Sequence, residues 1–154
     1  MTKTPAATPS LRAAALTWLA RREHSRQELR HRLVDSCPAT TIELDTLLDT
    51  LEAEGLLSDQ RCAESFTRMH VRRGHGPVLI RFELRERGIS EDLIATTLSN
   101  TAIDWTAMAQ ELIDRRFGDT SVVHGAALAK RMRFLHQRGF SGEQIRVALR
   151  DKDS

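Results

Sequence analysis

The chain has 154 residues, of which 40% are hydrophobic, 29% charged and 5% aromatic. This composition predicts a soluble, folded protein and excludes a disordered chain. No apolar run approaches the roughly 18 residues of a transmembrane helix, and the formal net charge of +2 conceals a strong pattern of charge along the chain.

The N-terminal sequence MTKTPAATPS is polar and lacks the apolar stretch of a signal peptide, so residues 1–10 are predicted to be a flexible tail. Beyond it, leucine and alanine dominate and alternating Val/Ile runs are absent, which favours helices over strands. Paired arginines recur near the ends of three predicted helices, at Arg21/Arg22, Arg72/Arg73 and Arg115/Arg116. This spacing predicts three repeats, each of three helices. They cover residues 11–57, 58–101 and 102–151.

The first repeat is predicted from three apolar stripes at helical spacing. Ser25 and Glu28 form a capping box that opens the second of its helices, and the Cys37–Pro38 pair breaks the chain before the third. The stripes consist of Ala15, Trp18 and Leu19, then Leu29 and Leu33, then Leu44, Leu47, Leu48 and Leu51.

The second and third repeats share a nearly repeated stretch, LRERGISEDLI and LHQRGFSGEQI. In each, a glycine (Gly88 or Gly139) can end a helix in the left-handed conformation, and a serine (Ser90 or Ser141) caps the next helix. The predicted helices cover residues 58–73, 77–87, 90–100, 103–117, 123–137 and 141–151. The fold is therefore predicted to be all-α, with nine helices in tandem three-helix units stacked into an elongated, curved monomer.

Charge alternates in blocks. Six arginines and two acids occupy residues 12–32, six acids and no base occupy 40–60, and six arginines and two acids occupy 68–87. Stacked in register, the units are expected to present one arginine-rich face, with acidic residues such as Asp45, Asp49 and Glu52 lying away from it. Since arginine's planar fork suits phosphates and carboxylates, this face predicts an acidic partner. The predicted partner-binding residues are Arg68, Arg72, Arg73, Arg81, Arg85, Arg131, Arg133 and Arg138.

Catalytic motifs are absent from the sequence, so we expect no catalytic residue, no cofactor and no metal site, and the chain is predicted not to be an enzyme. His70 and His75 near Cys62 match no zinc spacing and are interpreted as surface histidines, with Cys62 as a small core residue. Phe82 is expected to pack on a neighbouring helix. In the RGHGP stretch, a glycine helix end followed by Pro77 is favoured over a phosphate-binding turn.

Several segments in this order resemble the signature segments of the bacterial RecX regulatory proteins, from about Leu11 to Leu149. They are REHSRQELRHRL, LEAEGLLSDQRCAESFTRMHVRRGHGP, IRFELRERGIS and KRMRFLHQRGFS. Two positions depart from the family pattern, because His24 and Cys62 stand where aromatic residues are usual.

The resemblance implies a cytoplasmic regulator that binds the recombinase RecA and the RecA–DNA filament. It would inhibit ATP hydrolysis, strand exchange and coprotease activity, and so modulate DNA recombination, DNA repair and the SOS response. Two alternatives remain open: a helical-repeat protein that binds DNA directly through its arginine-rich face, and a scaffold for another acidic protein.

Overall fold

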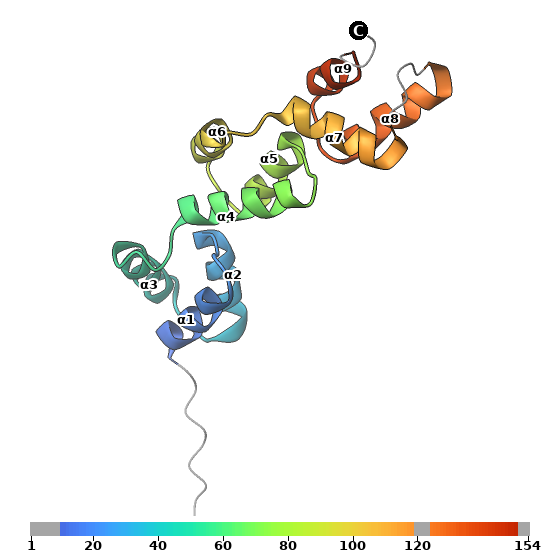
Figure 1. The fold of residues 1–154 in the computed structure, drawn as a ribbon. Helices are drawn as coiled ribbons and strands as arrows, with labels where there is room; N and C mark the ends of the chain where they lie inside the picture. The colour runs from blue at the N-terminus through green and yellow to red at the C-terminus, as the bar shows by residue number, and fades with distance from the viewer. Residues whose placement is uncertain (1–9, 119–123, 151–154) are drawn as a thin grey trace, which may run out of the picture. The chain divides into compact units, whose positions relative to one another are not determined.

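The computed structural model describes residues 10–118 and 124–150 of the chain (Figure 1). Over these residues the chain forms nine α-helices and no strand, which confirms the all-α prediction. The helices are α1 (Leu11–Arg21), α2 (Arg26–Ser36), α3 (Thr41–Ala53), α4 (Asp59–Arg72), α5 (Pro77–Glu86), α6 (Glu91–Asn100), α7 (Trp105–Phe117), α8 (Gly125–Gln137) and α9 (Gly142–Arg150). Residues 1–9 of the predicted tail, and the predicted helix ends at residues 123 and 151, lie outside the described residues.

The helices pack into two compact units. The first unit ends at Cys62 and the second begins at Ala63, so the division falls inside α4. The second unit therefore contains most of the predicted second repeat together with the third. The boundaries of the three repeats stay a prediction about the chain's organisation.

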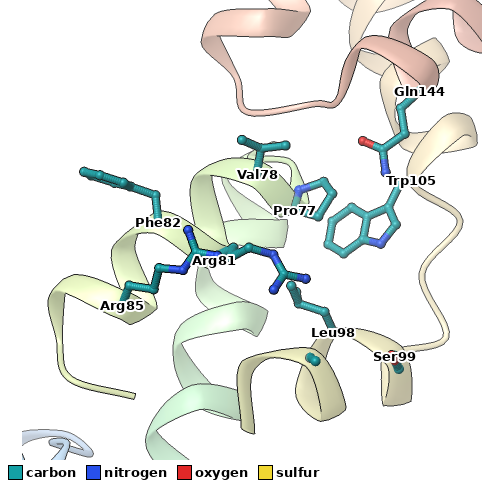
Figure 2. A pocket seen from close by; sticks show the side chains of 10 residues that line it. Pro77, Val78, Arg81, Phe82, Arg85, Leu98, Ser99, Trp105 and Gln144 are labelled. Atoms are coloured by element: carbon teal, nitrogen blue, oxygen red, sulfur yellow. The ribbon is translucent and has the colours of Figure 1, made fainter. Parts of the chain in front are cut away.

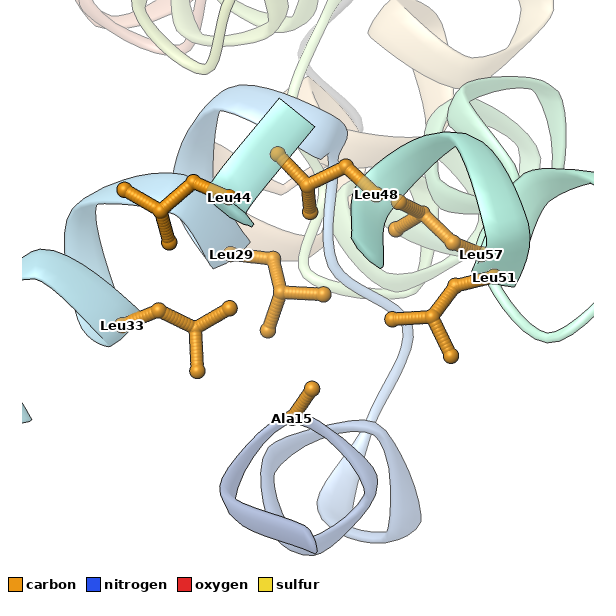
Figure 3. Packing of buried hydrophobic residues seen from close by; sticks show 7 residues of the cluster. All are labelled: Ala15, Leu29, Leu33, Leu44, Leu48, Leu51 and Leu57. Atoms are coloured by element: carbon orange, nitrogen blue, oxygen red, sulfur yellow. The ribbon is translucent and has the colours of Figure 1, made fainter. Parts of the chain in front are cut away.

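Leucines from α2 and α3 close over Ala15 of α1 to form the core of the first unit (Figure 3). The core residues are Ala15, Leu29, Leu33, Leu44, Leu48, Leu51 and Leu57. Their helices begin where the sequence predicts, because Ser25 and Glu28 make the expected capping box on α2 and Thr40 and Glu43 make another on α3. The i, i+3, i+4, i+7 spacing of the α3 leucines thus builds one continuous buried stripe.

Opposite charges within the first unit pair with one another. Arg26 of α2 places its guanidinium 2.8 Å from Asp49 and 3.1 Å from Glu52 of α3, and Arg30 pairs with Asp45. These acidic side chains therefore serve the packing of α2 on α3, and their expected separation from the arginine-rich face of the other repeats stays a prediction. The sequence could not show the pairing because it depends on how α2 packs against α3.

Arg26→Ala should lower the free energy of unfolding of the first unit by about 1 kcal/mol, because one half-buried guanidinium serves several carboxylates. Chemical denaturation measures the change. Gln27→Ala, at an exposed site on the same helix, is the control. In about 1 M salt the difference between the two variants should shrink, since screening then acts within roughly 3 Å. A difference that salt does not reduce would contradict the ion-pair explanation.

The second unit has two core clusters that meet at one residue. The first includes Ile80 and Leu84 of α5 with Ile94 of α6, and the second includes Ile113 of α7 and Leu135 of α8. Half-buried Trp105, at the start of α7, packs against both clusters. The indole therefore joins α4–α6 to α7–α9.

Two turns of the second unit are also joined by their backbones. The Gly76 N–H, before α5, donates to the Arg138 carbonyl oxygen at 2.7 Å, and the Val78 N–H donates to the Gly139 carbonyl oxygen at 2.8 Å. A Cβ atom at Gly76 would lie 2.6 Å from the Gly139 oxygen, and one at Gly139 would lie 2.3 Å from the Leu79 Cβ. Only glycine permits this approach at both positions. We call this contact the glycine joint, and it links the start of α5 to the turn between α8 and α9 within the second unit.

The local signals that predicted the helix ends are confirmed. Gly88 and Gly139 have φ angles of 80° and 93°, and the residues that follow them, Ile89 and Phe140, are buried. Ser90 accepts a hydrogen bond from the Leu93 N–H at 3.3 Å, as a predicted N-cap should.

Candidate partner-binding surface

All eight arginines predicted to bind a partner lie in the second unit. The side chains of Arg68, Arg72, Arg73, Arg85 and Arg133 are exposed, those of Arg81 and Arg138 are half-buried, and that of Arg131 is buried. The structure does not gather all of them at one place. It brings three of them together around one hollow and two around another.

The first hollow has a volume of about 340 Å³, and we call it the arginine hollow. Four guanidinium-bearing residues from three parts of the chain line it: Arg72, Arg73, Arg115 and Arg138. Glu111 is the only acidic residue among the lining residues that the structure describes. Because four cations face one carboxylate, the hollow has a local excess of positive charge and is suited to bind an anionic group.

Local geometry fixes the side chains around the arginine hollow. Gly74 follows the end of α4, and a Cβ atom there would lie 2.9 Å from the Leu112 Cδ2, so the turn sits directly against α7. Arg138 donates a hydrogen bond from Nη1 to the Arg73 carbonyl oxygen at 3.2 Å, and its guanidinium lies 5.3 Å from the centre of the Phe134 ring. The last turn of α4 and the end of α8 are thereby held next to each other.

Arg115 was not predicted as a site residue, although it forms one of the paired-arginine markers of the repeat. It lies on α7, forms an ion pair with Glu111 one turn earlier, and remains largely exposed. Its position beside Arg72 and Arg73 follows from the packing of α7 on the α4 turn. The paired arginines therefore marked Arg115 as part of a repeat, but they did not indicate that it belongs to a binding site.

Arg81 and Arg85 of α5 line a separate hollow of about 520 Å³ (Figure 2). Both pair with Glu91, which follows the capping residue of α6. The hydrogen bond from Arg85 keeps the pKa of Glu91 below its usual range. Phe82, which was expected to pack on a neighbouring helix, is 57% exposed at the margin of this hollow. That expectation is wrong, because α5 buries its other face through Ile80 and Leu84.

The remaining predicted site residues line neither hollow. Arg131 of α8 is buried: its guanidinium lies 4.7 Å from the centre of the Phe117 ring and donates to the Ala127 carbonyl oxygen at 3.2 Å. It therefore supports the packing of α7 on α8 and does not belong to the exposed surface. Arg68 and Arg133 are exposed on α4 and α8, outside the residues that line the two hollows.

A histidine pair, His70 and His75, flanks in sequence the turn that contributes Arg72 and Arg73 to the arginine hollow. His70 is buried, so its interpretation as a surface histidine is wrong. The two Nδ1 atoms lie 2.6 Å apart, a distance at which one ring donates and the other accepts, and the His70 Nε2 lies 3.2 Å from a Glu83 carboxylate oxygen. Burial lowers the pKa of both rings, and the nearby charges of Arg73 and, for His75, Arg138 lower it further.

Acidification should therefore destabilise the protein. His24 is buried as well, which lowers its pKa, so three histidines favour the neutral form in the folded state. Stability should be complete above the unfolded pKa of about 6.5 and decrease as the pH falls below it, because the unfolded chain then binds more protons. The thermal unfolding midpoint should be lower at about pH 5.5 than at about pH 7.5.

His75→Asn should reduce this pH dependence, because it removes one titrating ring from the pair. Paired carboxylates such as Glu91 lose their ion pairs only near or below pH 4.3, roughly the ordinary pKa of glutamate, and so do not contribute in this window. A midpoint that rises on acidification would contradict the role given to these histidines.

Metal and membrane sites are not found among the described residues. No three His, Cys, Asp or Glu side chains within 10–118 and 124–150 come together as ligands for a metal ion. In the same ranges no helix has both the length and the apolar character needed to cross a bilayer. The chemistry that the surface supports is recognition of acidic groups by guanidinium ions.

Comparison with protein families gives three matches, one for each predicted repeat. Residues 12–43 match the first three-helix domain of RecX, residues 58–98 the second and residues 103–149 the third. Together the matches span most of the chain.

Individual relatives are similar in sequence to this chain over nearly its whole length. The regulatory protein RecX of Halorhodospira halophila is 39% identical over 153 residues, which cover 99% of this chain and 94% of the relative. The regulatory protein RecX of Chromohalobacter salexigens is 42% identical over 146 residues, which cover 95% of this chain and 93% of the relative. The crystal structure of RecX from Lactobacillus salivarius has the same fold, with a TM-score of 0.78 at 22% identity and coverage of 93% of this chain and 94% of the other.

Proposed function

The chain belongs to the RecX family of regulatory proteins, and on this basis we propose that it binds RecA and the RecA–DNA filament and inhibits RecA activities. These activities are ATP hydrolysis, strand exchange and the coprotease reaction that starts the SOS response. The protein would act in the cytoplasm, as a monomer and by binding alone. The observation that supports this most directly is the family match along nearly the full chain.

The arginine hollow supports the proposal on physical grounds. A filament of RecA on DNA displays carboxylates on protein and phosphates on nucleic acid, and guanidinium groups bind both. We propose that Arg72, Arg73, Arg115 and Arg138 contact this acidic surface, with Arg68, Arg81, Arg85 and Arg133 contributing positive charge around it. Steering by such a field raises the rate of association and makes binding depend on salt.

Titration of the protein into RecA that is hydrolysing ATP on single-stranded DNA tests the proposal. We expect hydrolysis to fall as the protein approaches the amount of RecA, and the protein alone to hydrolyse no ATP. RecA turnover that stays unchanged over a wide titration, with RecA of the same organism, would reject the proposal.

Direct DNA binding is the second candidate, and the positive excess in the arginine hollow favours it. Binding to single-stranded DNA without RecA should then weaken steeply with salt, because phosphate contacts release counterions. If DNA alone binds as tightly as the filament does, direct DNA binding is the primary function.

A further inference from the structure

Helix α5 presents an outward face that the fold does not use. Val78, Arg81, Phe82 and Arg85 follow one another at the i, i+3, i+4, i+7 spacing that places residues on one side of a helix. Val78 is 51% exposed and Phe82 is 57% exposed. Since Ile80 and Leu84 on the other side of α5 are fully buried, the core does not need these two apolar side chains. Exposed apolar residues that adjoin a hollow indicate a contact surface.

The hollow beside this face is walled by residues from four helices (Figure 2). Pro77 of α5, Leu98 of α6 and Trp105 of α7 form apolar walls, and Gln144 of α9 adds a polar edge. Phe82 lies at the outer margin, on the side away from Trp105. We call this site the Phe82 groove. Its volume of about 520 Å³ is large enough to accept a bulky side chain from a partner.

The charges of the Phe82 groove indicate which residues would flank the partner's bulky side chain. Arg81 and Arg85 share a single carboxylate, Glu91, and their side chains stay 38% and 50% exposed. Two guanidinium groups that share one carboxylate can each donate to a further carboxylate oxygen, because each carries five N–H donors. The groove is therefore complementary to an apolar side chain that has acidic neighbours.

A protein segment fits these features better than a nucleic acid does. The walls at Pro77, Leu98 and Trp105 are apolar, so they complement an apolar side chain and offer no partner to a phosphate backbone. Glu91 offsets part of the positive charge of Arg81 and Arg85, whereas the arginine hollow holds four guanidinium groups against one carboxylate. The two hollows thus differ in the partner chemistry that they suit.

We propose that the Phe82 groove is the docking site for a protein segment with a bulky apolar side chain flanked by Asp or Glu. The apolar side chain enters between Pro77, Leu98 and Trp105, Phe82 covers it from the margin, and the flanking carboxylates pair with Arg81 and Arg85. The identification of this partner as RecA rests on the proposed function. The Phe82 groove then binds RecA, the protein component of the filament. The arginine hollow binds the DNA, which is its most acidic component.

Site-specific photocrosslinking tests the proposal. With p-benzoylphenylalanine in place of Phe82, irradiation in the presence of RecA and single-stranded DNA should join position 82 to RecA. Mass spectrometry should place the adduct on an apolar residue with acidic neighbours. The same photoreactive residue in place of Val147, exposed on α9 and outside the groove, is the control and should give little adduct.

A charge exchange tests the pairing. Arg81→Glu with Arg85→Glu should lower the yield of the adduct by about tenfold, the effect expected when charge pairs at an interface become repulsive. Reversing the acidic neighbours on RecA to lysine should restore it. Circular dichroism should show an unchanged helical spectrum for both the photoreactive and the reversed proteins, since the substituted side chains lie at the surface.

The outcomes separate the two proposals. If the protein inhibits RecA but position 82 gives no adduct, an adduct with DNA, or an adduct that the arginine reversals do not reduce, the docking site is wrong and the proposed function stands. If the protein neither binds nor inhibits RecA, the proposed function is wrong and this assignment of the groove fails with it.

Discussion

Gly139→Ala is expected to destabilise the second unit by about 3 kcal/mol or more, the largest effect of any single change considered for this fold. Gly139 has φ +93°, where an L-residue is strained, and its new Cβ would lie 2.3 Å from the Leu79 Cβ and 2.8 Å from the Leu79 backbone nitrogen. Helix α5 would have to move to relieve the overlap. That movement breaks the glycine joint and disturbs the contacts of Trp105.

Two further variants separate backbone strain from the overlap. Gly118→Ala has a φ of +80° with a ψ of 171° and nothing within 4 Å of the new Cβ, so it should cost about 1–3 kcal/mol through backbone strain alone. Gly76→Ala has an ordinary φ but places its Cβ 2.6 Å from the Gly139 carbonyl oxygen, so it should be costly through overlap alone.

Urea unfolding followed by Trp105 fluorescence, in a Trp18→Phe background, reports on the second unit. If Gly118→Ala and Gly139→Ala prove equally destabilising, the close contact of the glycine joint contributes nothing. If the Gly76 and Gly139 substitutions together cost less than the sum of their separate effects, the two residues act through one contact.

Arg72→Glu combined with Arg73→Glu should weaken binding to the RecA–DNA filament by about tenfold or more, which corresponds to at least 1.4 kcal/mol. Both residues line the arginine hollow, where four guanidinium groups face one carboxylate. The reversals turn the local attraction for an acidic surface into repulsion. Because both side chains are exposed, the helical content should not change.

The matched control is Arg116→Glu combined with Arg146→Glu, which changes the net charge equally, in the same unit, outside the hollow. Inhibition of RecA ATP hydrolysis, measured at several salt concentrations, compares the two proteins. We expect the hollow variant to lose inhibition and to show a smaller dependence on salt. Equal losses in both variants would mean that overall charge, and not the hollow, governs binding.

Features that depend on neighbouring residues in the sequence were predictable. The apolar spacing in α3, the capping box of Ser25 and Glu28, and the glycine helix ends at Gly88 and Gly139 all appear where the sequence places them. Each is decided within a few residues, by hydrogen bonds at a helix end or by the apolar stripe of one helix. The all-α fold follows from them.

Features that depend on packing between distant segments were not predictable. Arg131 and Arg133 are near neighbours in sequence, yet the first is buried against Phe117 and the second is exposed. His70 is buried and Phe82 is exposed, the reverse of what residue type and local pattern suggested. The candidate site was the least predictable feature, because α4, α7 and α8 must pack together before Arg72, Arg115 and Arg138 line one hollow.

The glycine joint also constrains when each unit can form during synthesis. The first unit is complete once Cys62 has left the ribosome, whereas the contact between Arg73 and Arg138 links residues 65 positions apart. Until Gly139 emerges, α5 lacks the carbonyl oxygens that its first turn requires, and closing so long a loop is slow. The nascent chain therefore carries a finished first unit and an unfinished second one while residues 63–139 are added. The arginine hollow forms only after Arg138 has been added, so a shorter nascent chain presents no such hollow to a partner.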